Sequence, residues 1–212
     1  MKLVIFDCDG VLVDSEPVTN RLMAEELTAH GLPTTPEESI ERFVGGTIKS
    51  VFESARQMGA ALPDDWVDHF YARMIDTLRN EVTIIPGVRD VLDALDIASV
   101  PYCVGSNGPM LKMDTTLKVT GLWDRLEGRI YSAHDVGIAK PDPGLFLHAA
   151  RDMGFGPEDC IVIEDSASGV RAAQAAGMTC FGFVRDTPAE KLIAHDAIPF
   201  ADMSELPELL GL

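Results

Sequence analysis

The sequence of 212 residues contains no apolar run near the length that crosses a membrane. A transmembrane helix needs about 20 consecutive apolar residues, whereas the amino terminus offers only the run at 3–6 before its first aspartate. We therefore expect neither a membrane anchor nor a signal peptide. The four cysteines lack the C-x-x-C spacing of zinc sites. Three of them lie in strand-like apolar runs, which predicts reduced, buried thiols and a cytoplasmic protein.

Basic residues are scarce, since 17 lysines and arginines face 34 acidic residues and the formal net charge is −17. A field of this sign repels nucleic acid, and no basic patch offsets it, so we expect no nucleic-acid partner. The chain also has no G-x-x-x-x-G-K-[ST] loop, which argues against a P-loop nucleotide-binding protein. An anionic small molecule would be repelled as well, unless local cations reverse the field inside a cleft.

Short continuous apolar runs recur along the chain, as in strands that are covered on both faces of a parallel sheet. They lie at 3–6, 102–105, 160–164 and 180–184, and 128–136 suggests a further strand. Each run except the last is followed by polar or glycine-rich residues and then by a helical pattern. This alternation predicts an α/β fold with a Rossmann-like, doubly wound and mostly parallel sheet.

Residues 16–84 interrupt the alternation, because they show helical patterns only. Thr35, Pro36 and Glu38 form the sequence signature of a helix start, a capping box with proline at the first helical position. The simplest arrangement is a helical domain inserted after the first strand. The predicted domains are a catalytic core of residues 1–15 and 85–212 and an inserted helical domain of residues 16–84.

Two pairs of acidic residues end two of the predicted strands: Asp7 with Asp9, and Glu164 with Asp165. The two-residue period of a strand places Asp7 and Asp9 on one side of its carboxyl end, where open α/β sheets bind ligands. Close carboxylates repel unless a cation lies between them, and Mg²⁺ prefers such oxygen ligands. A single pair would more often consist of helix caps or solvated loop residues. Two pairs at two strand ends favour a metal site.

Two further strand ends carry residues that suit a phosphate group. Ser106 and Asn107 precede a helix start, where free backbone N–H groups and the helix dipole attract anions. Lys140 lies between an apolar stretch and two prolines, so it is not on a solvated helix face. Either signal alone is weak, because Ser-Asn-Gly is usually a turn and most lysines are solvated. Their order along the chain with the acidic pairs strengthens both.

Four motifs occur in the order DCDGVLVDS (7–15), SNG (106–108), KPDP (140–143) and EDSASG (164–169). In these motifs and over its whole length, the chain resembles the haloacid dehalogenase-like hydrolases. The helical insertion resembles the cap domain of the subfamily that contains sugar phosphatases and β-phosphoglucomutase. Two shorter pieces, SNGPMLKM and SELPELL, are similar to bacterial 6-phosphogluconate phosphatases.

The resemblance implies roles for the motif residues. Asp7 would attack phosphorus and form an aspartyl-phosphate. Asp9 would protonate the leaving oxygen and later deprotonate the hydrolytic water. Mg²⁺ would be bound by Asp7, the Asp9 backbone carbonyl, Asp165 and Glu164, the last of these directly or through water. The phosphoryl oxygens would be bound by Ser106, the Asn107 amide and Lys140.

One loop of the inserted domain has paired glycines just before a helix, and we expect it to reach the site. Its candidate contacts to the leaving group are Arg42, Gly45, Gly46, Thr47 and Lys49. An ordinary helix–helix turn is the alternative for each of these residues. By closing on the core, such a domain would expel water and select the leaving group.

The function that we predict is Mg²⁺-dependent hydrolysis of a small phosphorylated metabolite, with a sugar phosphate as the favoured class. A phosphosugar mutase is the enzymatic alternative, although Thr19 stands where β-phosphoglucomutases carry a histidine and Lys49 is the only cation of the loop FVGGTIKS. A phospho-accepting signalling domain needs neither a second aspartate nor a helical insertion. A dehalogenase is disfavoured because those relatives lack the acid/base residue at the position of Asp9.

Overall fold

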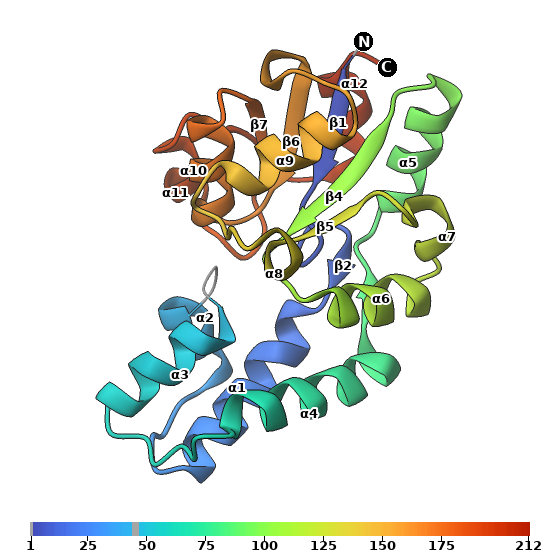
Figure 1. Ribbon diagram of the computed structural model, residues 1–212. Coiled ribbons are helices and arrows are strands. Elements are labelled where there is room, and N and C mark those ends of the chain that lie inside the picture. Colours follow the sequence, from blue (N-terminus) through green and yellow to red (C-terminus); the bar gives the residue numbers. More distant parts are fainter. Residues whose placement is uncertain (1, 44–46) are drawn as a thin grey trace.

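The computed structural model describes residues 2–43 and 47–212. Its centre is a six-stranded parallel sheet in the order β5-β4-β1-β6-β7-β8 (Figure 1). The strands are β1 (Leu3–Phe6), β4 (Tyr102–Ser106), β5 (Ile130–Ser132), β6 (Cys160–Glu164), β7 (Thr179–Phe183) and β8 (Ile198–Phe200). The chain proceeds outward from β1 first to one side and then to the other. The predicted doubly wound α/β fold is confirmed, and β1 lies at the point where the winding direction reverses.

Helices cover both faces of the sheet, which explains why its strands are continuous apolar runs. Leu3 and Ile5 of β1 belong to one buried cluster, and Val4 and Phe6 belong to the cluster on the opposite face. The helices that follow the strands are α5 (Val88–Ile97), α6 (Met110–Val119), α7 (Trp123–Leu126), α8 (Ala133–Val136), α9 (Gly144–Asp152), α10 (Ala167–Ala175), α11 (Ala189–Ile193) and α12 (Leu206–Leu210), with 3₁₀ turns η1 (Pro157–Asp159) and η2 (Met203–Glu205).

Four helices between β2 and β3 form a group of their own beside the sheet (Figure 1). They are α1 (Glu16–Ala29), α2 (Pro36–Phe43), α3 (Ile48–Gln57) and α4 (Trp66–Glu81). We call them the four-helix segment. Trp66 stacks on Phe52 and on Phe70, with ring centroids 6.2 Å and 5.0 Å apart, which ties α3 to α4. The predicted capping box is present, since Thr35 N donates to Glu38 Oε2 (3.0 Å) and Glu38 N donates to Thr35 Oγ1 (3.2 Å).

Two short strands connect the four-helix segment to the sheet. They are β2 (Val13–Asp14) and β3 (Thr83–Ile84), which pair antiparallel, so the two crossings of the chain lie side by side. Arg185 after β7 donates to Asp14 Oδ2 at 2.7 Å and holds β2 against the sheet side. These strands are too short to produce a pattern that sequence analysis can recognise.

The further strand expected over residues 128–136 is shorter than that span. It covers Ile130–Ser132 as β5, and the chain then enters the helical turn α8. The change occurs because Ser132 Oγ accepts a hydrogen bond from His134 N (3.2 Å) and so caps that turn. His134 is exposed on it.

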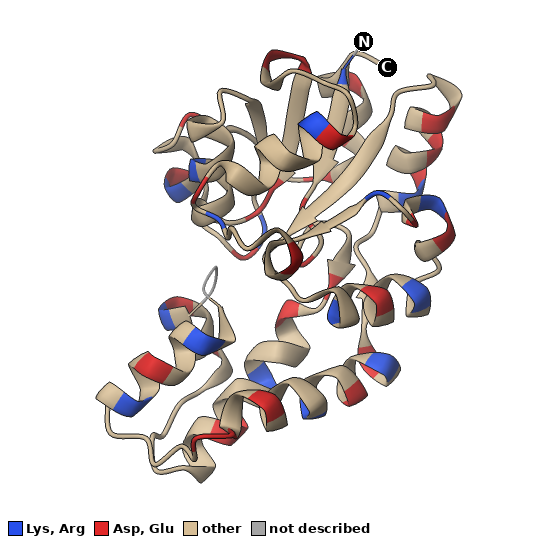
Figure 2. Cartoon of the chain, viewed as in Figure 1, with Lys and Arg blue, Asp and Glu red and all other residues tan. Residues whose placement is uncertain are grey.

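Charged residues are scattered over the helices on the side of the molecule seen in Figure 2, where Lys and Arg alternate with Asp and Glu and form no continuous basic band. In the part of the chain that the structure describes, no helix combines the length and apolarity that a membrane crossing requires.

Candidate active site

The sheet brings the two acidic pairs together. Phe6 of β1 is in register with Ile163 of β6, and Asp7 N donates to Ile163 O at 2.9 Å, so Asp7 lies beside Glu164. Asp165 follows directly, and the carboxylates of Asp7, Glu164 and Asp165 each place an oxygen within 4.8 Å of the others. All three residues are buried. Adjacent parallel strands that end at one edge therefore create the cluster that the sequence suggested.

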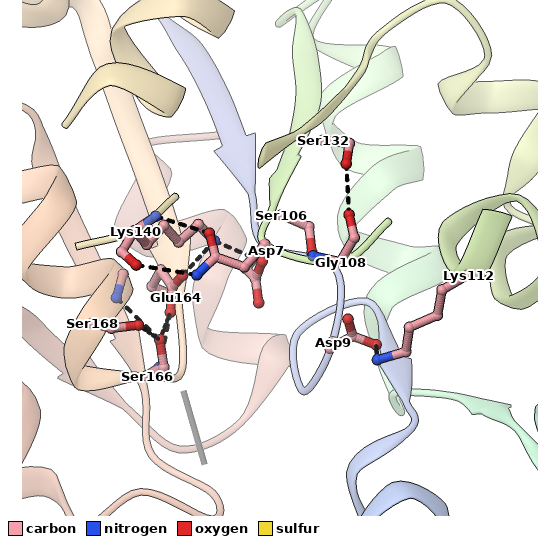
Figure 3. A network of polar contacts seen from close by, with 12 residues as sticks. Asp7, Asp9, Ser106, Gly108, Lys112, Ser132, Lys140, Glu164, Ser166 and Ser168 are labelled. Atoms are coloured by element: carbon pink, nitrogen blue, oxygen red, sulfur yellow. Dashed lines mark hydrogen bonds and ion pairs between the residues drawn. The ribbon is translucent and has the colours of Figure 1, made fainter. Parts of the chain in front are cut away.

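Lys140 is the cation of this cluster (Figure 3). Its Nζ lies 2.7 Å from Asp7 Oδ1 and 2.7 Å from Glu164 Oε1, and the residue is only 6% exposed. Burial alone would lower the pKa of the Lys140 ammonium, but the two carboxylates raise it above its usual range. Lys140 is therefore charged at neutral pH, and three buried carboxylates share one ammonium.

Burial makes ionisation of these carboxylates costly. It raises the pKa of Asp7 to about 7, against the opposing effect of Lys140 and with a further rise from Glu164 and Asp9. Burial, Glu164 and Asp7 likewise raise the pKa of Asp165. Glu164 differs in that both of its oxygens are engaged, Oε1 by Lys140 and Oε2 by the backbone N (2.8 Å) and Oγ (2.9 Å) of Ser166.

Asp9 lies across the site from this cluster and has partners of its own (Figure 3). Ser15 Oγ donates to Asp9 Oδ1, and Lys112 Nζ of α6 lies 2.8 Å from the same oxygen. Lys112 is 9% exposed. Burial would lower the pKa of Lys112, but Asp9 and Glu16 raise it, so the lysine is charged. Within the first acidic pair, Asp7 thus contacts Lys140 and Asp9 contacts Lys112.

The loop after β4 supports the Lys140 loop. Asn107 Oδ1 accepts from Lys140 N (2.8 Å), and Asn107 Nδ2 donates to Lys140 O (3.2 Å). Ser106 is 2% exposed, and its Oγ accepts from Gly108 N at 3.0 Å. The Asn107 side chain consequently fixes the backbone of Lys140, and the Ser106 hydroxyl lines the site beside Asp7.

Two glycines allow the acidic residues to come this close. A Cβ at Gly10 would lie 2.1 Å from Asp165 Oδ2, and Gly10 also has a positive φ of 79°. A Cβ at Gly169 would lie 1.7 Å from Glu164 Oε1. Gly10 is thus needed both for the turn after the Asp9 segment and for the space that the Asp165 carboxylate occupies.

A cavity of about 130 Å³ joins these residues to the four-helix segment. The lining residues of the sheet side are Asp7, Asp9, Ser106, Asn107, Gly108, Pro109, Lys112, Lys140, Glu164, Asp165, Ser166 and Ser168. Those of the four-helix segment and its loops are Glu16, Thr19, Asn20, Met23, Ser39, Phe43, Thr47, Ile48, Val51, Tyr71 and Met74. A second hollow of about 500 Å³ shares Phe43, Val51, Ser166 and Ser168 with the first and continues it outward.

The residues of the inserted segment that were expected to contact the leaving group differ in their distance from the cavity. Thr47 lines the inner cavity and caps α3, since its Oγ1 accepts from Ser50 N. Arg42 is exposed, lines the outer hollow and pairs with Glu38 on its own helix. Lys49 is exposed and lines neither hollow in the described chain. Gly45 and Gly46 lie outside the described residues.

Lys112 is the charged residue that sequence reasoning overlooked. It lies on the buried face of α6, in helical spacing with Met113, Thr116 and Leu117. A lysine in the apolar period of a helix is unusual, because a buried ammonium requires a partner. That periodicity was the available signal, although it does not identify Asp9 as the partner.

Comparisons with known proteins identify the family of the chain. The family of haloacid dehalogenase-like hydrolases matches residues 1–177. A 6-phosphogluconate phosphatase from Escherichia coli (strain K12) is 34% identical over 215 residues, which cover 99% of this chain and 94% of that protein. Hexitol phosphatase A from the same strain is 31% identical and covers 89% of this chain and 85% of its own length. A solved haloacid dehalogenase-like protein from Agrobacterium tumefaciens has a TM-score of 0.87 at 35% identity and covers 100% of this chain and 98% of its own.

These findings define a hydrolase with a parallel α/β sheet, and its candidate active site lies at the carboxyl ends of the central strands. The chain belongs to the haloacid dehalogenase-like hydrolases and is an enzyme of that family. The resemblance that its four motifs suggested is confirmed.

Proposed function

We propose that this enzyme is a Mg²⁺-dependent phosphomonoesterase of small phosphorylated sugars and polyols that acts through an aspartyl-phosphate on Asp7. The observation that carries the proposal is the buried arrangement around Asp7. Asp7 Oδ1 contacts Lys140. The carboxylates of Glu164 and Asp165 lie beside Asp7, and Asp9 lines the same cavity. The names of two relatives, a 6-phosphogluconate phosphatase and a hexitol phosphatase, support a phosphorylated sugar derivative as the substrate class.

In this mechanism Asp7 is the nucleophile. Lys140 holds Oδ1, which directs Oδ2 toward the phosphorus atom. A bond forms between Oδ2 and phosphorus as the bond from phosphorus to the ester oxygen breaks. Lys140 and Ser106 are placed to stabilise the charge on the phosphoryl oxygens, and such positioned charge is the main contribution that proteins make to phosphoryl transfer.

Asp9 supplies the proton transfers. It donates a proton to the departing ester oxygen, which leaves as an alcohol. The resulting carboxylate then takes a proton from water, whose oxygen attacks phosphorus, and inorganic phosphate leaves as Asp7 is regenerated. Ser15 and Lys112 both contact Asp9 Oδ1 and so orient the carboxyl group for these steps.

The residues present fit a hard divalent cation. Asp7, Glu164 and Asp165 are buried with one lysine, which leaves negative charge that a cation would balance. Asp7, Asp165 and the backbone carbonyl of Asp9 would hold Mg²⁺, whose charge would stabilise the phosphoryl group. Because Lys140 and Ser166 engage both oxygens of Glu164, contact of Glu164 through water fits better than direct contact.

Residues 16–84 act in this proposal as a cap domain on a core of residues 1–15 and 85–212. The antiparallel pair β2 and β3 joins the two parts and serves as the hinge. The cavity between Asp9 and the four-helix segment receives the leaving group. The four buried, free cysteines support a reducing, cytoplasmic location.

A panel of phosphate esters tests the function. The purified protein should release phosphate from 6-phosphogluconate, hexitol phosphates or related esters with Mg²⁺ and should stop in excess chelator. Asp7→Asn should be inactive yet folded. Wild-type rates in that variant, or hydrolysis that chelation leaves unchanged, would refute the mechanism. β-Glucose 1-phosphate with a trace of the 1,6-bisphosphate tests the mutase alternative, which predicts glucose 6-phosphate faster than free phosphate.

A further inference from the structure

Lys112 is a buried cation at the leaving-group side of the cavity. Its Nζ lies 2.8 Å from Asp9 Oδ1, and Asp9 must reach the ester oxygen in the proposed mechanism. The ammonium is thus close to the place where the first carbon atoms of the leaving group lie. Lys112 has three donors, of which the Asp9 contact uses one.

Two polar groups of the four-helix segment face the same space. Glu16 begins α1 and lines the cavity, and its Oε2 accepts from Asn20 Nδ2 at 2.9 Å. Burial raises the pKa of Glu16, the charge of Lys112 opposes this rise, and both residues line one cavity. Thr19 also lines the cavity, and its Oγ1 is buried without a hydrogen-bond partner among the described residues.

We infer that Lys112, Glu16 and Thr19 form a subsite that binds a hydroxyl group on the carbon next to the phosphoester carbon of the leaving group. Lys112 donates to that hydroxyl, Glu16 accepts from it, and the Thr19 hydroxyl donates to it. The inference rests on the proposed function and adds a specificity-determining role for three residues, of which Lys112 and Glu16 come from opposite sides of the hinge.

The charges favour a neutral hydroxyl over a carboxylate as the occupant. Lys112 already has two carboxylates near it, Asp9 and Glu16. A third carboxylate would be repelled by both, whereas a hydroxyl can accept from the ammonium and donate to Glu16. A buried hydroxyl such as Thr19 Oγ1 gains a partner when a polyol binds and stays unpaired when an alkyl group binds.

Two matched esters test the subsite. Glycerol 3-phosphate has the adjacent hydroxyl, and 3-hydroxypropyl phosphate lacks only that group. The wild type should prefer glycerol 3-phosphate in kcat/KM by roughly 10- to 100-fold, the range for a charge-assisted hydrogen bond. Lys112→Met should remove most of this preference, since it loses the donor as well as the Asp9 contact. Lys118→Met on the same helix is the control, because Lys118 is exposed and pairs with Asp114.

The ratio of kcat/KM for the two esters distinguishes a loss of hydroxyl recognition from a loss of Asp9 orientation. If Lys112 only orients Asp9, Lys112→Met lowers kcat for both esters equally and leaves the ratio intact, which overturns the inference. Thr19→Val is a second variant that preserves shape, and it should lower the ratio through KM for glycerol 3-phosphate. Phosphoglycolate distinguishes the charge: a wild-type preference for it that Lys112→Met abolishes would assign a carboxylate and overturn the hydroxyl subsite.

The same assay distinguishes the two levels of the proposal. A wild-type enzyme that cleaves both esters without preference overturns the subsite and leaves the phosphatase function standing. An enzyme that releases phosphate from no ester of the panel overturns the proposed function and the subsite with it.

Discussion

The buried carboxyl group of Asp7 should make the stability of the metal-free protein depend on pH in an unusual direction. Burial raises its pKa from 3.8 to about 7 in the folded state. Between these values the folded protein holds a proton that the unfolded chain has lost. The folded state therefore binds more protons, and the free energy of unfolding falls as the pH rises. Above about pH 7 the contribution of Asp7 levels off.

The size of this effect follows from the two pKa values. Each pH unit between them is worth about 1.4 kcal/mol, so the ionisation of Asp7 costs the folded state about 4 kcal/mol in total. Only the part above pH 5 is easily measured, and it amounts to about 3 kcal/mol. Asp7 is 8% exposed, so solvent screens little of this cost.

Urea unfolding in a chelator at pH 5, 6, 7 and 8 measures the effect. The wild type should lose about 3 kcal/mol more than Asp7→Asn across this range, because asparagine has nothing to ionise. Subtracting the two curves removes the contribution of the carboxylates that do not interact with Asp7. Asp68→Asn is the control, since Asp68 is exposed on α4, and it should follow the wild type within about 0.5 kcal/mol.

Adding Mg²⁺ should reduce the difference between the wild type and Asp7→Asn, because a cation favours the ionised carboxylate. The stabilisation by Mg²⁺ should consequently be larger at pH 8 than at pH 5. A difference curve that is flat in chelator would refute the cost of burying Asp7. If the free energy of unfolding of the wild type instead rose with pH relative to that of Asp7→Asn, Lys140 would outweigh burial in setting the pKa of Asp7.

Three further predictions concern the acid, the turn and the thiols. Asp9→Asn should lower kcat/KM at least about 100-fold for an alkyl phosphate but much less for p-nitrophenyl phosphate, whose leaving group needs no proton; equal losses would contradict the acid role. Gly10→Ala should destabilise the fold by about 2 kcal/mol and weaken Mg²⁺ binding, as measured by calorimetry. Gly31 also has a positive φ, but a Cβ there would have no close neighbour, so the control variant Gly31→Ala should lose stability without losing Mg²⁺ affinity. Undiminished Mg²⁺ affinity in Gly10→Ala would contradict the expectation that the added Cβ displaces the Asp165 carboxylate. Burial raises the pKa of Cys160 to about 11 and the pKa values of the other three thiols above their usual range, so Ellman's reagent at pH 8 should label the protein only after denaturation.

The sheet and the order of its site residues could be predicted because short-range patterns determine them. A strand that is covered on both faces must be a continuous apolar run, as Leu3–Phe6 is. Parallel strands end at a common edge, so acidic residues at the ends of 3–6 and 160–164 were expected at that edge, and the pairing of β1 with β6 brings them together. Here the local pattern and the global arrangement lead to the same answer.

The hinge and the leaving-group side could not be predicted in the same way. β2 and β3 have two residues each, and their pairing joins residues about 70 positions apart without any periodic signal. The position of Glu16 opposite Lys112 depends on that hinge and on the packing of α4 against α6. Contacts of this kind arise from the way the four-helix segment packs beside the sheet, which no local pattern encodes.

The pairing of the two cavity lysines with carboxylates limits how strongly they can attract a phosphate ester. Among the described lining residues there are five carboxylates and two lysines. Lys140 is already paired with Asp7 and Glu164, and Lys112 with Asp9. Even with Asp7 protonated, Lys140 stays paired with Glu164 and Lys112 with Asp9, so the lysines alone do not make the cavity attractive to phosphate.

On the proposed function, we therefore expect a divalent cation to bind before the substrate. Inorganic phosphate should raise the melting temperature of the protein when Mg²⁺ is present and have almost no effect in chelator, because the metal supplies positive charge beyond that of the two lysines, which are already paired with carboxylates. Lys140→Met should lose this phosphate response while Mg²⁺ still stabilises the fold, since the variant keeps all three carboxylates. Equal stabilisation by phosphate with and without Mg²⁺ would show that Lys140 is released from its carboxylates by the anion itself, and the order of binding would then be reversed.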